Sequence, residues 1–173
     1  LVLVERLTKI AFTDALTGLA SRRAFVDTLN HRLQSQSRDS TVIVLIDVDQ
    51  FAETNDMFGH GYGDELLRGL AHRLRNALPS DVLVARLAAD SFALLGSPEQ
   101  LSIAPLRKVL AVPFVFDGEE RPISVSSSSV AANEAEEHAD GNDLLKDASI
   151  VIKRGKAEGL GRHTSYTRQF RQE

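Results

Sequence analysis

The sequence contains no cysteine and no tryptophan, and only five of its 173 residues are lysines. Without cysteine there are no disulfide bonds, thiolate metal ligands or cysteine nucleophiles. No apolar run approaches the ~18 residues of a membrane-spanning helix, and no signal peptide opens the chain. The net charge of −4 and the pI near 5.7 argue against a nucleic-acid-binding face, which is usually basic. We therefore expect a cytoplasmic protein with no membrane segment and no nucleic-acid partner.

The composition is that of a globular domain, with 43% hydrophobic and 25% charged residues. At this length the chain forms one domain with a substantial core. The first residue is not methionine, so we expect a piece of a longer protein. We expect a linker helix over residues 1–12, the domain over 13–167 and a C-terminal linker over 168–173.

Hydrophobic periodicity places the remaining secondary structure. It predicts helices over residues 22–36, 64–77, 98–110 and 141–158. Apolar and β-branched runs predict strands over 41–49, 82–87, 92–95, 113–118 and 121–130, with a short strand ending near 166. Hairpins mixed with helices indicate an α/β protein, specifically an α+β sandwich, with a mainly antiparallel central sheet of about five strands flanked by helices.

Acidic residues gather where one buried strand ends. Asp47 and Asp49 are two residues apart, so the period of a strand directs both to one side. Asp90, in the turn between two short strands, is the natural third acid. Such carboxylates suit Mg²⁺, and two metal ions can clamp a nucleoside triphosphate. The alternative is a solvated structural role, which is common for acids at strand ends.

An amide and a carboxylate flank the glycine-rich stretch 59–63. Asn55 and Asp64 together offer the donors and acceptors that recognise the edge of a guanine base. The alternative is that Asn55 is a loop residue and Asp64 a helix cap.

Three strings occur in a fixed order along the chain. They are D-A-L-T-G-L-A-S-R-R (14–23), D-V-D-Q-F-A-E-T-N-D-M-F-G-H-G-Y-G-D-E-L-L (47–67) and R-L-A-A-D-S-F-A-L-L (86–95). Together they resemble the GGDEF family, the diguanylate cyclases and their relatives. A fourth family block is weakly echoed over 144–160, so the resemblance spans residues 7 to 166.

The resemblance implies a fold of the nucleotidyl-cyclase and polymerase-palm type. Active members condense two GTP molecules into cyclic di-GMP, with one GTP on each domain of a homodimer and Mg²⁺ as cofactor. The implied metal ligands are Asp47, the Val48 carbonyl and Asp90, and Asp90 is also the signature acid. The implied nucleotide-binding residues are Phe51, whose backbone region faces the phosphates, Asn55, His60, Asp64 and Lys156.

Several positions depart from the family pattern. The signature is Ala88-Ala89-Asp90-Ser91-Phe92 instead of G-G-D/E-E-F. Alanine lacks the left-handed freedom of glycine, so we expect strain in this turn unless it shifts. A serine cannot be an ionised metal ligand or a carboxylate base. Ala52 replaces the family lysine, and no lysine lies between residues 10 and 107.

A family feedback site, R-x-x-D, is also absent, because Pro79 and Val82 occupy its ends. The resemblance therefore implies a degenerate GGDEF domain: a non-catalytic module that binds GTP and regulates an attached sensor or EAL phosphodiesterase domain. Three alternatives stay open, namely a working diguanylate cyclase, a relative with other nucleotide chemistry, and a purely structural or dimerising module.

Overall fold

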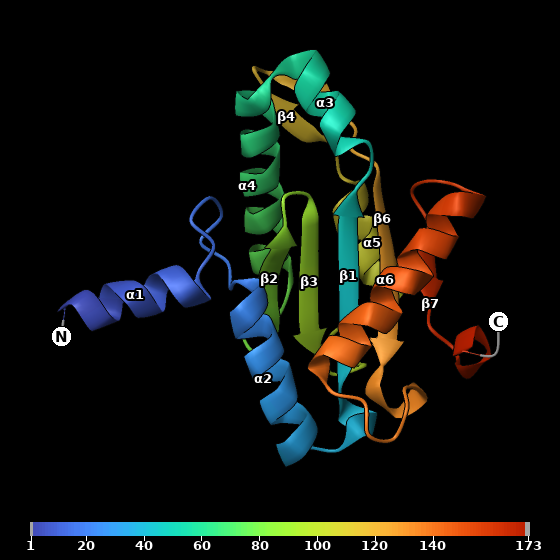
Figure 1. The fold of residues 1–173 in the computed structure, drawn as a ribbon. Coiled ribbons are helices and arrows are strands. Elements are labelled where there is room, and N and C mark those ends of the chain that lie inside the picture. Colours follow the sequence, from blue (N-terminus) through green and yellow to red (C-terminus); the bar gives the residue numbers. More distant parts are fainter. Residues whose placement is uncertain (1, 172–173) are drawn as a thin grey trace.

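The centre of the molecule is a five-stranded sheet with the strand order β2-β3-β1-β6-β7 (Figure 1). The computed structural model describes residues 2–171, apart from the side chains of residues 10, 170 and 171. The strands are β1 (Val42–Val48), β2 (Leu83–Ala88), β3 (Ser91–Gly96), β6 (Val125–Ala131) and β7 (His163–Ser165). Neighbouring strands are antiparallel except β6 and β7, which are parallel. The predicted sheet is confirmed.

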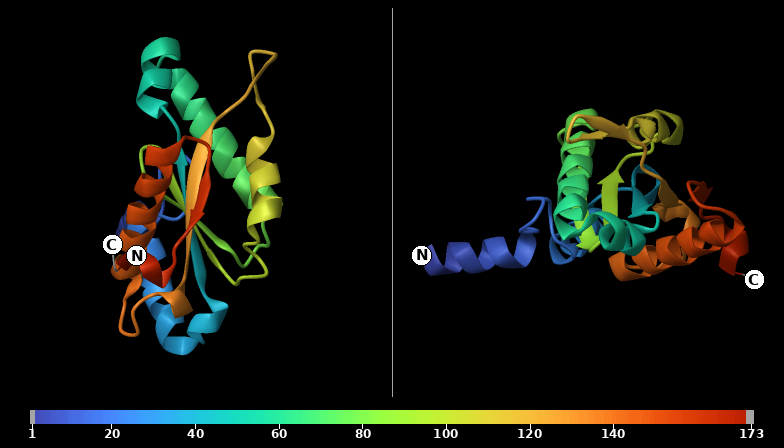
Figure 2. Two further views of the ribbon diagram at one scale, coloured as in Figure 1. Left: turned by 90° about the vertical axis from the view of Figure 1, so that its right-hand side faces the viewer. Right: turned by 90° about the horizontal axis from the view of Figure 1, so that it is seen from above.

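Helices cover both faces of this sheet (Figure 2). They are α1 (Val2–Phe12), α2 (Arg22–Ser35), α3 (Phe51–Phe58), α4 (His60–Ala77), α5 (Ile103–Ala111) and α6 (Gly141–Glu158). The helices α4 and α5 pack on one face, and α2 and α6 on the other. The helix α1 extends away from the sheet (Figure 1). Within residues 2–171, no helix has both the length and the apolar character needed to cross a bilayer.

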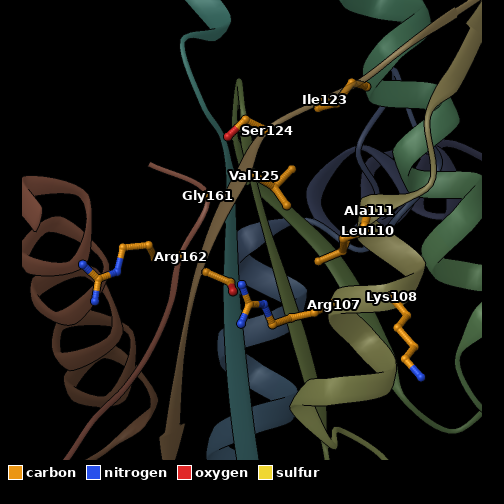
Figure 3. Close-up of a pocket in the computed structure, with 10 residues that line it drawn as sticks. Arg107, Lys108, Leu110, Ala111, Ile123, Ser124, Val125, Gly161 and Arg162 are labelled. Carbon is orange, nitrogen blue, oxygen red and sulfur yellow. The ribbon is translucent and has the colours of Figure 1, made fainter. Parts of the chain in front are cut away.

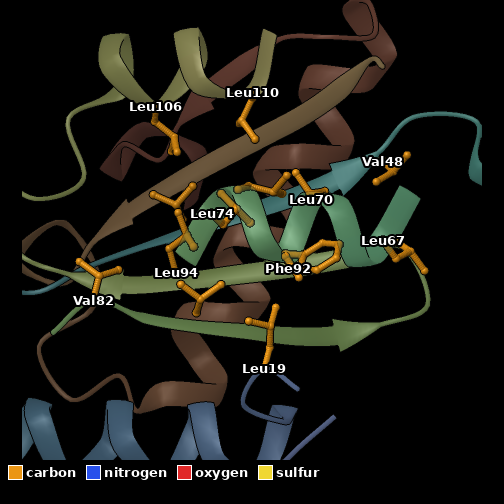
Figure 4. Packing of buried hydrophobic residues seen from close by; sticks show 14 of the residues in the cluster. Leu19, Val48, Leu67, Leu70, Leu74, Val82, Phe92, Leu94, Leu106 and Leu110 are labelled. Carbon is orange, nitrogen blue, oxygen red and sulfur yellow. The ribbon is translucent and has the colours of Figure 1, made fainter. Parts of the chain in front are cut away.

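The alternation of β1 decides which face each of its side chains joins. Even-numbered residues, such as Ile46 and Val48, pack into the core with α4 and α5, where Leu70 and Phe92 also lie (Figure 4). Ile43 and Leu45 pack on the face of α2 and α6. Asp47 continues this odd-numbered series, so it lies on the side of α6.

The segment after β1 differs from the prediction. It forms a helix, α3, before the glycine-rich stretch, and α4 begins at His60 instead of 64. The two helices are separated at Gly59, whose φ of 90° is left-handed. The stretch predicted as a glycine-rich turn is therefore largely the first turn of α4.

The second predicted hairpin is shorter than expected and lies outside the main sheet. Its strands are β4 (Phe114–Phe116) and β5 (Glu119–Arg121), joined at Asp117 and Gly118 with φ values of 51° and 78°. The predicted strand over 121–130 is thus divided between β5 and β6. The helix α5 begins at Ile103 instead of 98, and residues 98–101 form turns before it.

Candidate nucleotide-binding site

Asp47, at the end of β1, has a partner for each carboxylate oxygen. Ser91 lies opposite it in β3 and donates a hydrogen bond from Oγ to Oδ1 at 2.8 Å. The Lys156 ammonium lies 2.9 Å from Oδ2 and forms a salt bridge. The Asp47 and Lys156 side chains are only 18% and 29% exposed. Ion pairs that are partly withdrawn from water are screened less than surface pairs.

Small residues bring Lys156 to this position. A methyl group on Gly155 would lie 2.4 Å from Thr164 Oγ1, so only glycine allows α6 to approach β7 this closely. The hydroxyl of Ser128, on β6, donates to the Ala148 carbonyl of α6 at 2.8 Å. The helix is therefore fastened to the sheet on the face to which Asp47 belongs.

Asp49 has a different environment from Asp47. It is buried and accepts hydrogen bonds from Ser124 Oγ at 2.5 Å, Ser126 Oγ at 2.7 Å and the Gly161 N–H at 3.0 Å. These bonds join the end of β1 to the start of β6 and to the loop after α6. Asp49 is thus held by structural partners and does not face outward beside Asp47 as a second open carboxylate.

Asp90 lies in the turn between β2 and β3. Its main-chain oxygen accepts a hydrogen bond from the Val48 N–H at 3.0 Å, which brings this turn beside the end of β1. Its side chain is half-buried. The main chain of Asp90 therefore lies beside Asp47 and Val48 at the C-terminal end of the central strand β1.

The alanines of the signature turn are not strained in the expected way. Outside glycine, positive φ occurs among the described residues only at two positions, neither of which is Ala88 or Ala89. A bulge between Arg86 and Ala88 shifts the register instead, and Arg86 donates to the Ala89 carbonyl at 2.8 Å. The expected left-handed strain is absent because the bulge reshapes the turn.

Arg86 also connects the turn to residues 14–23, the first of the three strings that resemble the family. Its guanidinium lies 3.2 Å from Asp14 Oδ1, and Thr17 donates to Asp14 Oδ2 from both N–H and Oγ1. Burial alone raises the pKa of Asp14, but the Thr17 hydrogen bonds and the charge of Arg86 outweigh it and lower the pKa. Asp14, in the string D-A-L-T-G, thus holds Arg86 in place, and Arg86 in turn binds the main chain of the signature turn.

The donors around Asp47 differ from the oxygen ligands that Mg²⁺ prefers. Residues 2–171 contain no group of three or more histidine, aspartate or glutamate side chains arranged to hold a metal ion. Both oxygens of Asp47 are already engaged, one by a positive charge. Mg²⁺ requires near-octahedral oxygen ligation. The residues present therefore do not fit the family metal as they stand.

The start of α3 offers a place for phosphate. Gln50 precedes the helix in a left-handed conformation, with φ 54° and ψ 39°, and its side chain does not cap the helix. The first N–H groups of a helix have no partner within the helix and carry partial positive charge. Phe51 is buried beneath this turn, and Ala52 is exposed. Backbone donors are therefore available here without a lysine.

The predicted base-binding residues meet at the junction of α3 and α4. A methyl group on Gly63 would lie 1.9 Å from Asn55 Oδ1 and 3.1 Å from Phe51 Cζ, so Asn55 packs directly on Gly63. Its Oδ1 is buried and has no hydrogen-bond partner. Asp64 follows Gly63 and is half-buried, whereas His60 is exposed. The structure thus packs Asn55 against Gly63, the residue before Asp64 in α4, and leaves His60 at the surface.

An aromatic cluster that sequence reasoning missed supports this junction. Arg121 of β5 lies over the Phe58 ring, 4.8 Å from its centre, and over Tyr62 at 5.7 Å. Tyr62 also meets Phe116 of β4 edge-on at 4.4 Å. The cluster fastens the small β4–β5 sheet to the α3–α4 junction. A basic residue in a short strand gave no signal of this contact in the sequence.

A pocket of about 450 Å³ lies apart from these residues, between α5, β6 and the loop after α6 (Figure 3). Its polar side chains include Arg107, Lys108 and Ser127. None of the predicted nucleotide or metal ligands lines it. The Arg162 side chain points away from Arg107 (Figure 3) and pairs with Glu158 at 3.3 Å. This pocket is therefore separate from the candidate nucleotide-binding site.

Comparison with known proteins gives consistent matches. A family model described as "Diguanylate cyclase, GGDEF domain" matches residues 11–162. The chain is 30% identical over 173 residues to the cyclic di-GMP phosphodiesterase PdeR of Escherichia coli, covering 97% of this chain and 26% of PdeR. It is 33% identical over 161 residues to the diguanylate cyclase TpbB of Pseudomonas aeruginosa, covering 87% of this chain and 36% of TpbB.

Solved structures agree with these matches. The GGDEF domain of TpbB from Pseudomonas aeruginosa superimposes with a TM-score of 0.78 at 29% identity, covering 93% of this chain and 99% of that domain. A diguanylate cyclase/phosphodiesterase structure from Caldicellulosiruptor saccharolyticus has a TM-score of 0.84 at 20% identity, covering 93% of this chain and 96% of the other, and it shares the fold. The chain belongs to the GGDEF family and is a domain of cyclic di-GMP signalling.

Proposed function

We propose that this domain is a non-catalytic regulatory module that binds GTP and modulates a domain attached to it. One observation carries the proposal. The fourth signature position is Ser91, whose hydroxyl donates to Asp47. A hydroxyl in this place supplies neither a charged metal ligand nor a carboxylate base. The site therefore lacks one of the carboxylates that would take part in joining two nucleotides.

The base-binding half of the site supports retention of GTP. Asn55 packs on Gly63, the residue before Asp64, and Asn55 Oδ1 is buried without a partner. An unpaired buried polar atom costs about 1–3 kcal/mol, so such atoms often mark functional sites. A carboxylate beside an amide matches the N–H donors and the carbonyl of guanine. Adenine would leave Asp64 without the N1–H donor.

The phosphate-binding half supports the loss of catalysis. The start of α3 offers backbone N–H groups, but Ala52 and the exposed Glu53 contribute no positive charge there. Removing one preorganised donor or charge at a developing negative charge typically lowers the rate by 10²–10³-fold, about 3–4 kcal/mol. Binding suffers less from this loss than catalysis, because charge accumulates in the transition state.

The relatives suggest how such a module is used. The chain spans 26% of PdeR and 36% of TpbB, so in both proteins the matching region belongs to a longer chain. One is named a phosphodiesterase and the other a cyclase. A GGDEF domain without cyclase activity fits a chain named as a phosphodiesterase, and in the present protein the regulated enzyme would be an attached EAL phosphodiesterase domain.

Calorimetry and product analysis test the two parts of the proposal. We expect GTP to bind at least about tenfold tighter than ATP, because a site built on buried polar groups rejects a mismatched partner strongly. Asp64→Asn should abolish this preference. Glu65→Gln makes the same change of charge at an exposed neighbour and should not. Equal affinity for both nucleotides would overturn the GTP assignment.

Catalysis is tested separately by incubating the protein with GTP and Mg²⁺ and measuring cyclic di-GMP by mass spectrometry. No steady product formation is expected. Sustained turnover by pure protein would favour the alternative, a working diguanylate cyclase.

A further inference from the structure

The Asp47–Lys156 pair occupies the position where the family resemblance places a metal ion. Asp47 Oδ2 lies 2.9 Å from the Lys156 ammonium, and Oδ1 accepts the Ser91 hydroxyl at 2.8 Å. Each oxygen thus already has a strong donor, and one of these donors is a full positive charge. A divalent ion that used Asp47 would have to displace the ammonium.

The local charges favour the ammonium over a divalent ion. The family signature offers an acid at the position of Ser91, which here is neutral. The negative charge of Asp47 is paired directly with the positive charge of Lys156, and both side chains are largely shielded from water. Asp90 is a further acid at this end of β1. Mg²⁺ gives up its water reluctantly and depends on carboxylates to hold it. With one carboxylate replaced by a hydroxyl, the site has lost part of what holds a divalent ion.

The position of Lys156 is set by packing and does not depend on a flexible surface side chain. It follows Gly155, whose missing side chain allows α6 to contact Thr164 of β7. Lys153, one turn earlier on the same helix, is exposed. The two lysines therefore form a natural pair for comparison, because only one of them reaches a carboxylate of the site.

We infer that Lys156, together with Ser91 in place of the signature acid, occupies both oxygens of Asp47 and excludes divalent metal from it, so that this domain binds nucleotide without Mg²⁺. The metal exclusion stands by itself, whereas the nucleotide part rests on the proposed GTP binding. Removing the ammonium should open a divalent site formed by Asp47, Asp90 and the Val48 carbonyl, because the turn that carries Asp90 is hydrogen-bonded to the end of β1.

A titration with Mn²⁺ followed by electron paramagnetic resonance tests the exclusion in the absence of nucleotide. Lys156→Met should bind Mn²⁺ about fivefold tighter than the parent, since the ion pair to be displaced is worth about 1 kcal/mol. Lys156→Arg and Lys153→Met should behave as the parent, and adding Asp47→Asn to Lys156→Met should remove the gain. Circular dichroism checks folding, and Lys156→Gln replaces the methionine variant if that variant unfolds.

Two Mn²⁺ results would overturn the exclusion: equal binding by the parent and Lys156→Met, or a gain that survives Asp47→Asn. The nucleotide part is tested by GTP calorimetry with EDTA and with Mg²⁺. The Kd of the parent for GTP should differ by less than about twofold between the buffer with EDTA and the buffer with Mg²⁺, whereas a contribution of about 1.4 kcal/mol from the metal would change it tenfold. GTP binding only with Mg²⁺ overturns the metal-free site. Absence of GTP binding in both buffers overturns the proposed function, while the Mn²⁺ titration still decides the exclusion.

Discussion

Replacing Gly63 by alanine tests the contact that holds the base-binding residues together. The added methyl group would lie 1.9 Å from Asn55 Oδ1 and 3.1 Å from Phe51 Cζ. Asn55 must therefore turn away, and the buried Phe51 must yield slightly. Gly61, two residues earlier in α4, is the matched control, because a methyl group there meets nothing within 4 Å.

The size of the effect follows from two opposing terms. Overpacking a well-packed site costs about 1–3 kcal/mol. Exchanging glycine for alanine in a helix stabilises it by up to about 1 kcal/mol. Gly63→Ala should therefore lower the free energy of unfolding by about 1–2 kcal/mol, and Gly61→Ala should leave it unchanged or raise it. For a domain of this size, 1 kcal/mol corresponds to about 2–4 °C in Tm.

Urea unfolding and GTP calorimetry on the two variants measure these effects. Gly63→Ala should also weaken GTP binding, because Asn55 is displaced from its place against Gly63, and Gly61→Ala should not. Two variants of equal stability would refute the close packing of Asn55 on Gly63. A destabilised Gly63→Ala with unaltered GTP affinity would refute the role of Asn55 in base recognition.

Three further predictions concern groups outside the base-binding junction. Burial and the positive charge of Arg107 lower the pKa of His163. As the pH falls below about 6.5, the unfolded chain therefore takes up a proton before the folded domain does, and the folded domain loses stability. The urea concentration at the unfolding midpoint should fall between pH 7 and pH 5, and it should fall less in His163→Gln. The lowered pKa of Asp14 stabilises the fold above about pH 4, and this contribution is lost as the pH falls through the pKa of the folded state. Asp14→Asn should therefore destabilise the domain at pH 7, and the Tm of the variant should approach that of the parent near pH 2. Ser126→Ala removes one of the donors to the buried Asp49 and should cost about 1–2 kcal/mol in urea unfolding; an unchanged midpoint would show that this hydrogen bond contributes no net stability.

The elements with strong local signals were predicted closely from the sequence. The strand expected over 41–49 is β1, Val42–Val48, because a run of β-branched residues suits a strand covered on both faces. The last helix was predicted with the bounds of α6. Its first turn has a capping box between Asp140 and Asp143, and Gly159 ends it.

The α3–α4 junction was not predicted, because its cause is tertiary. Residues 51–58 have their apolar residues at the two ends and polar residues between them, so they offer little helical periodicity. Three glycines within 59–63 indicated a turn, but only Gly59 has a left-handed φ. Gly63 is required for a different reason, since Asn55 and Phe51 pack against it. From the sequence alone, a glycine that leaves room for a neighbouring side chain cannot be distinguished from a glycine that adopts a left-handed φ, because the residues that pack against it are not known.

The candidate site shows the same division between local and distant information. The family motifs located Asp47, Asp90, Asn55, Asp64 and Lys156 from the sequence, but not which of them touch. Asp47 and Lys156 are 109 residues apart, and they meet because β6 pairs with β1, β7 pairs with β6, and α6 crosses this face.

In the sequence, Ser91 indicates only the loss of an acid from the family signature. In the folded domain it is also the gain of a donor to Asp47, and together with Lys156 it leaves that carboxylate fully satisfied by the protein itself. A site that has lost a catalytic acid is thereby also one that no longer presents an open carboxylate, which is the physical reason to expect that binding and catalysis have separated in this domain.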